Sequence, residues 1–109
     1  MSKPQTQRWI AIARAGDVEP SDVRRCDVED RCIALFNLDG TLYATADICT
    51  HAHAHLSDGY VDGDTVECPL HQGLFHIPTG RAMSPPVTEN LKTYPLRVEH
   101  GEVLIALDD

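Results

Sequence analysis

The hydrophobic residues of this chain lie in short β-favouring stretches that are separated by polar residues and turn signals. Two of these stretches are 9–13 (WIAIA) and 31–36 (RCIALF). Further candidate strands are 60–61, 65–66, 73–77, 94–99 and 102–107. The only candidate helix is one short turn at 19–23, because no 3.6-residue apolar period continues from it. The pattern predicts an all-β fold of antiparallel sheets.

Turn residues between the stretches fix several expected pairings. The D-G turn at 38–41 predicts a hairpin of 33–36 with 42–45. Turns are also expected at 61–64, 78–80 and 100–101, where Gly or Pro favours a bend.

A second hairpin decides whether Cys26 and Cys32 form a disulfide. If Glu29-Asp30 is a two-residue turn, Cys26 lies opposite Ile33, and Cys32 lies opposite the preceding strand's Asp27. The two sulfur atoms then point to different faces of the ribbon. We therefore expect free thiols.

Length and charge restrict the function. The chain has 109 residues, and we expect one domain over 1–109. It has no apolar run of transmembrane length, and its first residues (MSKPQTQ) carry no signal or transit pattern, so a cytoplasmic location is expected. Seventeen Asp and Glu against nine Lys and Arg give a net charge of -8, which argues against nucleic acid and anionic membranes as partners.

The acidic residues are unevenly distributed. The stretch from Asp47 to Glu67 contains carboxylates but no Lys or Arg. This stretch is either a docking surface for a basic partner or a solvated acidic loop, and the sequence does not distinguish the two.

Cysteine and histidine are concentrated in two short motifs. Cys49-Thr50-His51 is a C-x-H motif, and Cys68-Pro69-Leu70-His71 is a C-x-x-H motif. Two thiolates and two imidazoles can hold one structural zinc ion, or a [2Fe–2S] cluster with the cysteines on one iron and the histidines on the other. Zinc loops usually pair like ligands within one knuckle, whereas each loop here supplies one Cys and one His. The spacing therefore favours the two-iron cluster.

These residues, in CTHAHAHLSDG and ECPLHQGLFHIPTGRAMSPP, resemble the Rieske iron–sulfur family, specifically the small ferredoxins of bacterial aromatic-ring dioxygenase systems. The resemblance implies a small Rieske domain with a two-loop cluster-binding lobe, with loops at 47–56 and 67–76. It implies Cys49 and Cys68 on the inner iron and His51 and His71 on the outer iron, with a covering loop at 84–87 that contains Pro85 and Pro86.

The resemblance also implies a cluster potential toward the lower end of the range of about -150 to +300 mV that Rieske centres span. High-potential relatives carry an extra Cys pair, where this chain has Ala54 and Leu70. They also direct Ser and Tyr hydroxyls at the cluster, where this chain has Gly73 and Phe75. Fewer hydrogen bonds to sulfur leave the reduced state less stabilised.

By the same resemblance, the chain is an electron-transfer component of aromatic hydrocarbon catabolism and not itself an enzyme. It would be a monomer that passes single electrons from an NAD(P)H-dependent reductase to a terminal ring-hydroxylating oxygenase. Two alternatives stay open. The chain could be a Rieske subunit held tightly in a larger oxidoreductase, or a binding module stabilised by zinc.

The remaining polar and aromatic residues have simpler expected roles. We expect His53 and His55 to be loop residues rather than ligands, although either could tune the cluster or contact a partner. His76 and His100 are expected in a strand or turn, and Asp58 and Asp62 in turns. Trp9, Phe36 and Phe75 are expected in the core.

Overall fold

The structure is a computed structural model that describes residues 7–50, 54–70, 72–85, 87 and 89–108. The elements found in this part of the chain are β1 (Gln7–Arg14), the 3-10 helix η1 (Ala15–Asp17), β2 (Asp22–Val28), β3 (Arg31–Leu38), β4 (Thr41–Ala46), the 3-10 helix η2 (Leu56–Asp58), β5 (Tyr60–Asp62), β6 (Thr65–Glu67), β7 (Leu74–His76), β8 (Thr93–Tyr94), β9 (Leu96–Glu99) and β10 (Glu102–Asp108).

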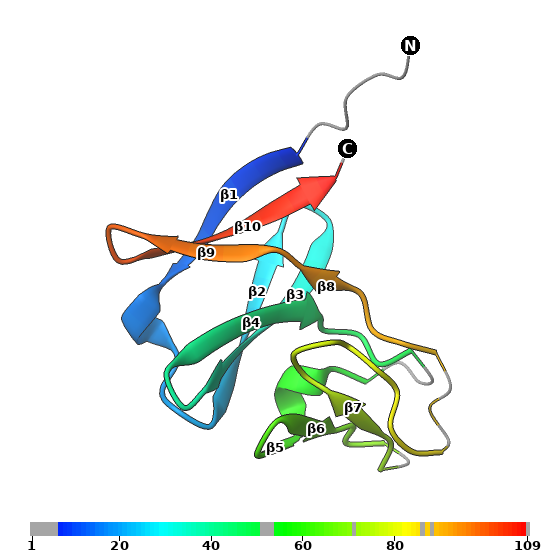
Figure 1. Ribbon diagram of the computed structural model, residues 1–109. Helices are drawn as coiled ribbons and strands as arrows, with labels where there is room; N and C mark the ends of the chain where they lie inside the picture. The colour runs from blue at the N-terminus through cyan, green and yellow to red at the C-terminus, as the bar shows by residue number, and fades with distance from the viewer. Residues whose placement is uncertain (1–6, 51–53, 71, 86, 88, 109) are drawn as a thin grey trace.

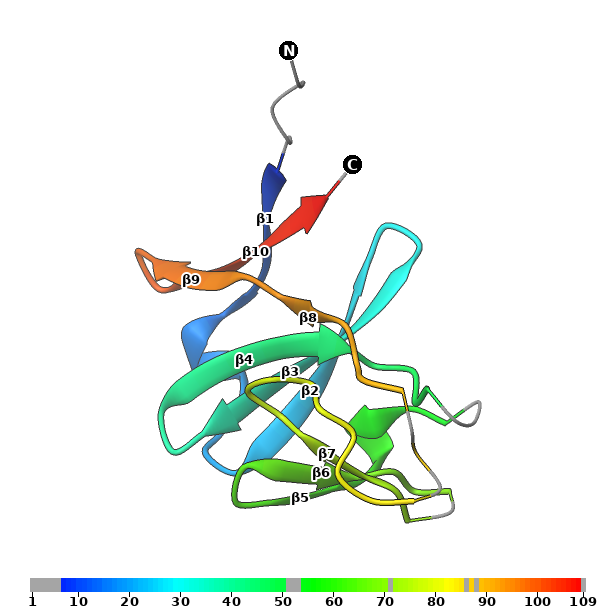
Figure 2. The same cartoon turned by 45° about the vertical axis from the view of Figure 1, so that its right-hand side comes forward.

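The strands form three antiparallel sheets, which confirms the all-β prediction. Two sheets, in the orders β1-β10-β9 and β2-β3-β4-β8, make up a region that we call the base. The third sheet, β5-β6-β7, belongs to a smaller region that we call the lobe, which also includes η2 and the loops on either side of the sheet. Figures 1 and 2 show the lobe beside β4, at the opposite end of the molecule from β1 and β10.

Strand β3 lies between the core of the base and the core of the lobe. Its side chains pack alternately into these two cores. Ile33 and Leu35 pack into the core of the base, together with Val103, Ile105 and Leu107 of β10. Residues on the opposite face, Ala34 and Phe36, pack into the core of the lobe. Because both faces of β3 are buried, its sequence CIALF is a continuous apolar run rather than an alternating one.

The predicted hairpins have the predicted registers. Leu38 pairs with Thr41 around Asp39 and Gly40, which have φ of 54° and 96°. Those positive values belong to the primed turn that a D-G pair favours. In the β2–β3 hairpin, Cys26 pairs with Ile33 and Asp27 with Cys32, as expected from a turn at Glu29-Asp30.

The predicted strand 94–99 is instead two strands, because the chain changes sheet at Pro95. Thr93 and Tyr94 pair with β4 of one sheet, whereas Leu96 pairs with β10 of the other. Proline has no N–H to donate to a ladder, so it suits a position between two pairings.

The helical turn expected at 19–23 is absent from that segment. The two short helices lie at 15–17 and 56–58, while Ser21 has a φ of 66° and Asp22 already begins β2. Among the described residues there is no helix whose length and hydropathy would suit a membrane span.

Candidate metal centre

Cys49 and Cys68 are brought together inside the core of the lobe. Cys49 follows β4 and Cys68 follows β6, and their side chains are 4% and 0% exposed. The Cys49 side chain lies close enough to the Cys68 thiol to raise the pKa of that thiol. Both cysteines are free, so the arrangement presents two buried sulfur donors side by side.

The environment of these thiols is suited to a metal centre rather than to reactive chemistry. Burial, and then the contact with Cys49, raises the pKa of the Cys68 thiol to about 11. Without a cation, this buried thiol keeps its proton at neutral pH. A positively charged iron centre would supply the charge that allows both sulfurs to bind as thiolates.

Backbone hydrogen bonds close both cysteine-bearing loops. Cys49 N donates to Ala54 O at 2.9 Å, and Cys68 N donates to Gly73 O at 2.8 Å. Each bond spans the segment in which the sequence places a histidine ligand. The loops are therefore short and closed, as a fixed ligand geometry requires.

The expected covering loop packs on the second cysteine-bearing loop. Leu74 N donates to Ser84 Oγ at 3.2 Å. Val87 is buried, and a Cβ placed on Gly73 would lie 2.5 Å from its Cγ1. A side chain at position 73 would therefore push the covering loop away. This steric limit explains why a glycine suits position 73.

The other two expected ligands, His51 and His71, lie outside the described residues, as do His53 and Pro86. Ala54 is buried, and Leu70 is 49% exposed. Neither of these two residues carries sulfur, so no disulfide can join them.

Asp47 departs from its expected place in an acidic surface. Its side chain is completely buried, and its carboxylate accepts hydrogen bonds from Ser57 N at 2.7 Å and Ser57 Oγ at 2.9 Å. The exposed acids of the stretch are Asp58, Asp62 and Asp64. The predicted acidic surface is therefore smaller than the sequence indicates.

His55 and Cys32 lie against the same carboxylate. His55 Nδ1 is 2.8 Å from Asp47 Oδ2, and Cys32 Sγ is 3.4 Å from that oxygen. His55 is therefore more than a simple loop residue, although it does precede η2 as a loop residue would. Sequence reasoning missed this group because Cys32 is 15 residues from Asp47 and 23 from His55 along the chain.

The remaining predicted residues are placed as follows. Cys26 is buried in the base, and neither it nor Cys32 forms a disulfide. Phe36 and Phe75 are fully buried, as expected, but Trp9 is only partly buried and has the Arg97 guanidinium 4.1 Å from its ring centroid. His76 is in β7, where it contacts Asp64 and Thr79, and His100 is in the β9–β10 turn.

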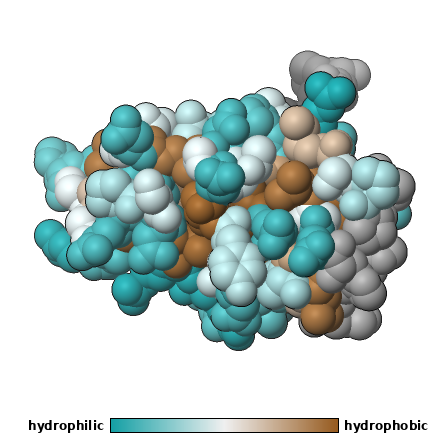
Figure 3. All heavy atoms as spheres, turned by 90° about the horizontal axis from the view of Figure 1, so that it is seen from below, coloured by the Kyte–Doolittle hydropathy of each residue, from teal (hydrophilic) through white to brown (hydrophobic). Residues whose placement is uncertain are grey.

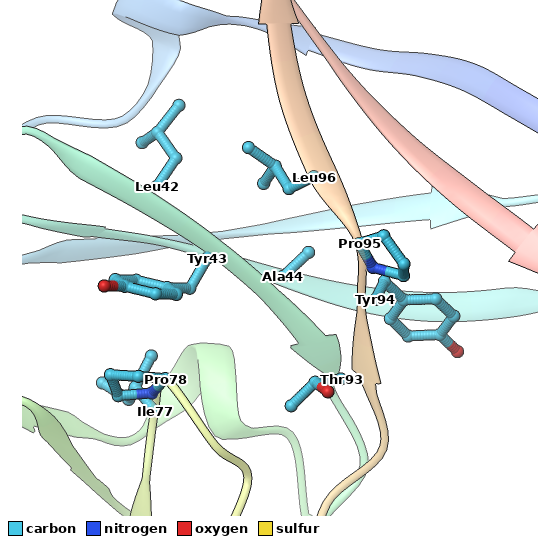
Figure 4. A pocket seen from close by; sticks show the side chains of 9 residues that line it. All are labelled: Leu42, Tyr43, Ala44, Ile77, Pro78, Thr93, Tyr94, Pro95 and Leu96. Carbon is cyan, nitrogen blue, oxygen red and sulfur yellow. The ribbon is translucent and has the colours of Figure 1, made fainter.

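A cavity of about 440 Å³ lies between β4, the segment after β7, and the β8–β9 strands. Figure 4 shows its lining, with Tyr43 of β4 facing Ile77 and Pro78 from the segment after β7. The lining residues supply hydroxyl groups but no carboxylate, imidazole, thiol or amine. The lining therefore offers no base to activate the hydroxyl groups of Tyr43, Thr93 and Tyr94.

Comparison with known proteins assigns a family to this arrangement. The family model described as the Rieske [2Fe-2S] domain matches residues 8–95. The ferredoxin component of the naphthalene 1,2-dioxygenase system of Pseudomonas putida is 45% identical over 102 residues, which cover 94% of this chain and 98% of that protein.

Solved structures agree with the family match. The ferredoxin of Sphingomonas yanoikuyae B1 superposes with a TM-score of 0.88 at 36% identity, covering 92% of this chain and 99% of that one. A chain from a complex of reduced oxygenase and oxidized ferredoxin in carbazole 1,9a-dioxygenase gives a TM-score of 0.84 at 39% identity, covering 90% and 92%.

The chain belongs to the Rieske [2Fe–2S] domain family. Its cofactor is a [2Fe–2S] cluster, and it is an electron carrier of the ferredoxin class rather than an enzyme in its own right. The two buried, adjacent thiols fit that cofactor, because a Rieske cluster needs two thiolates on its inner iron.

Proposed function

We propose that Cys49, His51, Cys68 and His71 hold the cluster, with the two cysteines on the inner iron and the two histidines on the outer iron. The burial and mutual contact of Cys49 and Cys68 support this assignment. Segments 47–56 and 67–76 are then the ligand loops, and 84–87 is the covering loop, all within one domain. When bound, the cluster accepts and releases one electron at a time.

We also propose that the chain carries electrons from an NAD(P)H-dependent reductase to a terminal ring-hydroxylating oxygenase. The observation that carries this proposal is the similarity to ferredoxin components of dioxygenase systems, which extends over 98% and 99% of two of those proteins. Coverage of nearly the whole of those relatives favours a separate monomeric carrier over a tightly held subunit. The free cysteines are compatible with the cytoplasm as its location.

The surface near the proposed ligands has the character of a transient docking site. Ile48 is 41% exposed and precedes Cys49, while Leu70 precedes His71. Figure 3 shows the lobe end of the molecule with apolar patches among polar side chains. Exposed apolar residues beside a redox centre would let a partner approach closely, and the surrounding acids would steer a basic partner.

A reconstituted electron-transfer assay tests this function. The purified protein is mixed with reductase and oxygenase of a ring-hydroxylating system, and oxygenase reduction is followed by stopped-flow absorbance at increasing salt. We expect the second-order rate constant to fall as ionic strength rises, because exposed charges are screened within about 8 Å at physiological salt. A salt-independent rate would remove the electrostatic part of the proposal, and no transfer would remove the carrier role.

The exposed acids provide a matched test of the docking surface. Asp58→Asn and Asp62→Asn should weaken the salt dependence, because both carboxylates are solvent-exposed in the lobe. The control is Glu19→Gln, an exposed acid on the η1–β2 connection of the base. Equal effects from all three variants would point to overall charge rather than to a docking site in the lobe.

The metal and sulfide content of the protein tests the alternative of a binding module stabilised by zinc. We expect two irons and two acid-labile sulfides per chain, together with visible absorption. The potential should lie toward the low end of the Rieske range, because Gly73 and Phe75 supply no hydroxyl to the cluster. Protein that is colourless and contains one zinc and no sulfide would support the alternative.

A further inference from the structure

Three metal-binding types of side chain converge at the base of the first ligand loop. Cys32 comes from β3, Asp47 from the end of β4, and His55 from the residue before η2. Their Sγ, carboxylate oxygen and ring nitrogen all lie within 4.8 Å of one another. None of the three is among the four proposed cluster ligands.

One carboxylate oxygen, Asp47 Oδ2, has polar side-chain atoms from three other residues close to it. Asp47 Oδ2 lies 2.8 Å from His55 Nδ1, 2.9 Å from Ser57 Oγ and 3.4 Å from Cys32 Sγ. A carboxylate oxygen offers about two lone-pair sites, and among the described residues Asp47 Oδ1 accepts a hydrogen bond only from the Ser57 N–H. Three polar side-chain atoms therefore lie close to one buried oxygen.

A tetrahedral zinc ion would resolve that crowding. Zinc bond lengths of about 2.3 Å to sulfur and about 2.0–2.2 Å to nitrogen and oxygen put neighbouring ligand atoms about 3.3–3.6 Å apart. The Cys32 sulfur already lies 3.4 Å from Asp47 Oδ2 and 3.6 Å from His55 Nδ1. Only the 2.8 Å edge between His55 and Asp47 is too short, so the imidazole would move outward by a few tenths of an ångström.

A further carboxylate lies on the neighbouring strand, outside the group of three whose ligand atoms are within 4.8 Å of one another. Asp27 pairs with Cys32 in the β2–β3 register, and the nearby Cys32 thiol and Arg25 guanidinium lower the pKa of its carboxyl. The Arg25 guanidinium, 3.3 Å from Asp27, offsets part of the negative charge. The remaining groups that face the site are the carboxylates of Asp27 and Asp47, which favour a cation.

The same surroundings make the free thiol unreactive. Burial, and then contacts with Asp27 and Asp47, raise the pKa of the Cys32 thiol to about 12. Cys32 is therefore not poised as a nucleophile or a redox-active thiolate at neutral pH. The carboxylates that hold a proton on this sulfur would attract a divalent cation in its place.

We propose that Cys32, Asp47 and His55 form a three-residue zinc site, with solvent in the remaining position. The thiol proton is released to solvent as the sulfur binds, and His55 binds through Nδ1 with its own proton on Nε2. A donor set with sulfur and nitrogen selects zinc over calcium or magnesium, which take oxygen ligands. Ser57 holds the Asp47 carboxylate from behind, as supporting residues of metal sites do.

The ion would tie the two ends of the first ligand loop to β3. Asp47 N already donates to Cys32 O at 2.9 Å, and Leu56 N donates to Asp47 O at 2.7 Å. Zinc would add bonds between the side chains of Cys32, Asp47 and His55. Cys49 lies in the loop between Asp47 and His55. The site would therefore stiffen the loop that carries one half of the proposed cluster ligands.

The test uses the protein with its iron–sulfur cluster in place, so that the cluster ligands are already occupied. The holoprotein is dialysed against zinc chloride, washed, and analysed for zinc, iron and sulfide. Zinc K-edge X-ray absorption then reports the zinc neighbours without interference from iron. We expect one zinc per chain with unchanged iron and sulfide, and one sulfur neighbour at about 2.3 Å among nitrogen and oxygen atoms.

Two variants and two matched controls make the test specific. Cys32→Ser and His55→Gln should each lower zinc affinity by at least about tenfold, since even residues behind the ligands contribute that much. The controls are Cys26→Ser, a thiol buried in the base, and His76→Gln, whose ring nitrogen also contacts a carboxylate at 2.9 Å. Both controls should bind zinc as the parent does, and retained cluster absorption shows that each variant is folded.

Several results would overturn the proposal. These are no zinc retained by the holoprotein, zinc without a sulfur neighbour, zinc affinity unchanged in Cys32→Ser and His55→Gln, or iron and sulfide lost as zinc enters. Loss of iron and sulfide as zinc enters would mean that zinc replaces the cluster. Failure of the proposed electron-carrier function is seen separately, in the untreated protein, as missing iron or missing electron transfer.

Discussion

The base and the lobe bury their residues in different ways. In the base, β1, β2, β3 and β10 are 7 or 8 residues long and pair over nearly their whole length around a core of aliphatic side chains. In the lobe, β5, β6 and β7 have 3 residues each, and its core includes Cys49 and Cys68. Short strands bury little apolar area, so the lobe depends more on specific links between its loops.

This difference indicates that the base can fold by itself while the lobe needs its metal centre. The two loops that carry the cysteines meet in the interior of the lobe, and a bound cluster would cross-link them as a structural metal does. The largest effect is therefore expected from removing a proposed ligand.

Cys68→Ser should abolish iron binding and loosen the lobe while leaving the base intact. Loss of one thiolate leaves the inner iron without its full ligand set. Hydrogen–deuterium exchange should show lost protection in β5–β7 and retained protection in β3 and β10. The control is Cys26→Ser, a buried thiol of the base that should keep full iron content. Loss of protection in both regions would contradict the separation.

Truncation of a core side chain in each region should separate the two responses. Phe75→Ala should destabilise the lobe by about 3–5 kcal/mol, and Leu35→Ala the base by about 2–5 kcal/mol. In a denaturant titration followed by visible absorption and by far-ultraviolet circular dichroism, Phe75→Ala should lose the cluster before the base unfolds. In Leu35→Ala the two signals should change together, because the lobe packs on β3. If Phe75→Ala instead unfolded the base before losing the cluster, the separation of the two regions would be contradicted.

Substituting one glycine in each region tests the same comparison with a smaller expected change in stability. A Cβ at Gly59 would collide with the backbone carbonyl of Glu67, whereas nothing lies within 4 Å of a Cβ at Gly16 in η1. Gly59→Ala should cost about 1–3 kcal/mol of stability, the range for overpacking. Gly16→Ala should change stability by less than about 0.5 kcal/mol. Thermal unfolding of both variants distinguishes a steric effect in the lobe from a general effect of Gly substitution.

A further effect concerns alkaline pH and the junction between the regions. The Cys32 pKa is raised from an ordinary value of 9.0 to about 12, so between these values the folded protein binds more protons than the unfolded chain. Stability from this group is fully present below pH 9.0 and is lost as pH rises toward 12. In zinc-free holoprotein, Cys32→Ser should therefore show a shallower decline in unfolding free energy above about pH 9. Identical pH profiles would show that Cys32 does not titrate this way.

The sequence predicted most of the base because its signals are local. The D-G turn after Leu38 and the Glu29-Asp30 turn set the hairpin registers within a few residues. Pro95 could have shown where the chain changes sheet, since proline interrupts a ladder. Trp9 is another exception in the base, because it is only partly buried and lies against Arg97 of β9.

The candidate site was predictable where chemistry is carried by motif spacing. The mixed Cys and His motifs singled out Cys49 and Cys68, which the structure places together in the core of the lobe. The role of Asp47 was not predictable, because its burial depends on Ser57, His55 and Cys32 folding around it from separate segments. An acidic residue in an acidic stretch carries no signal of burial until those partners are placed.

The central claim is that two histidines and two cysteines hold a two-iron cluster at the end of the lobe. Pulsed electron paramagnetic resonance of the dithionite-reduced protein tests it most directly, because imidazole nitrogens bound to iron couple magnetically to the unpaired electron. We predict strong nitrogen couplings from two histidines, which should change in His51→Cys and His71→Cys and persist in His76→Gln. A cluster signal without strong nitrogen coupling, or zinc in place of iron and sulfide, would contradict the account.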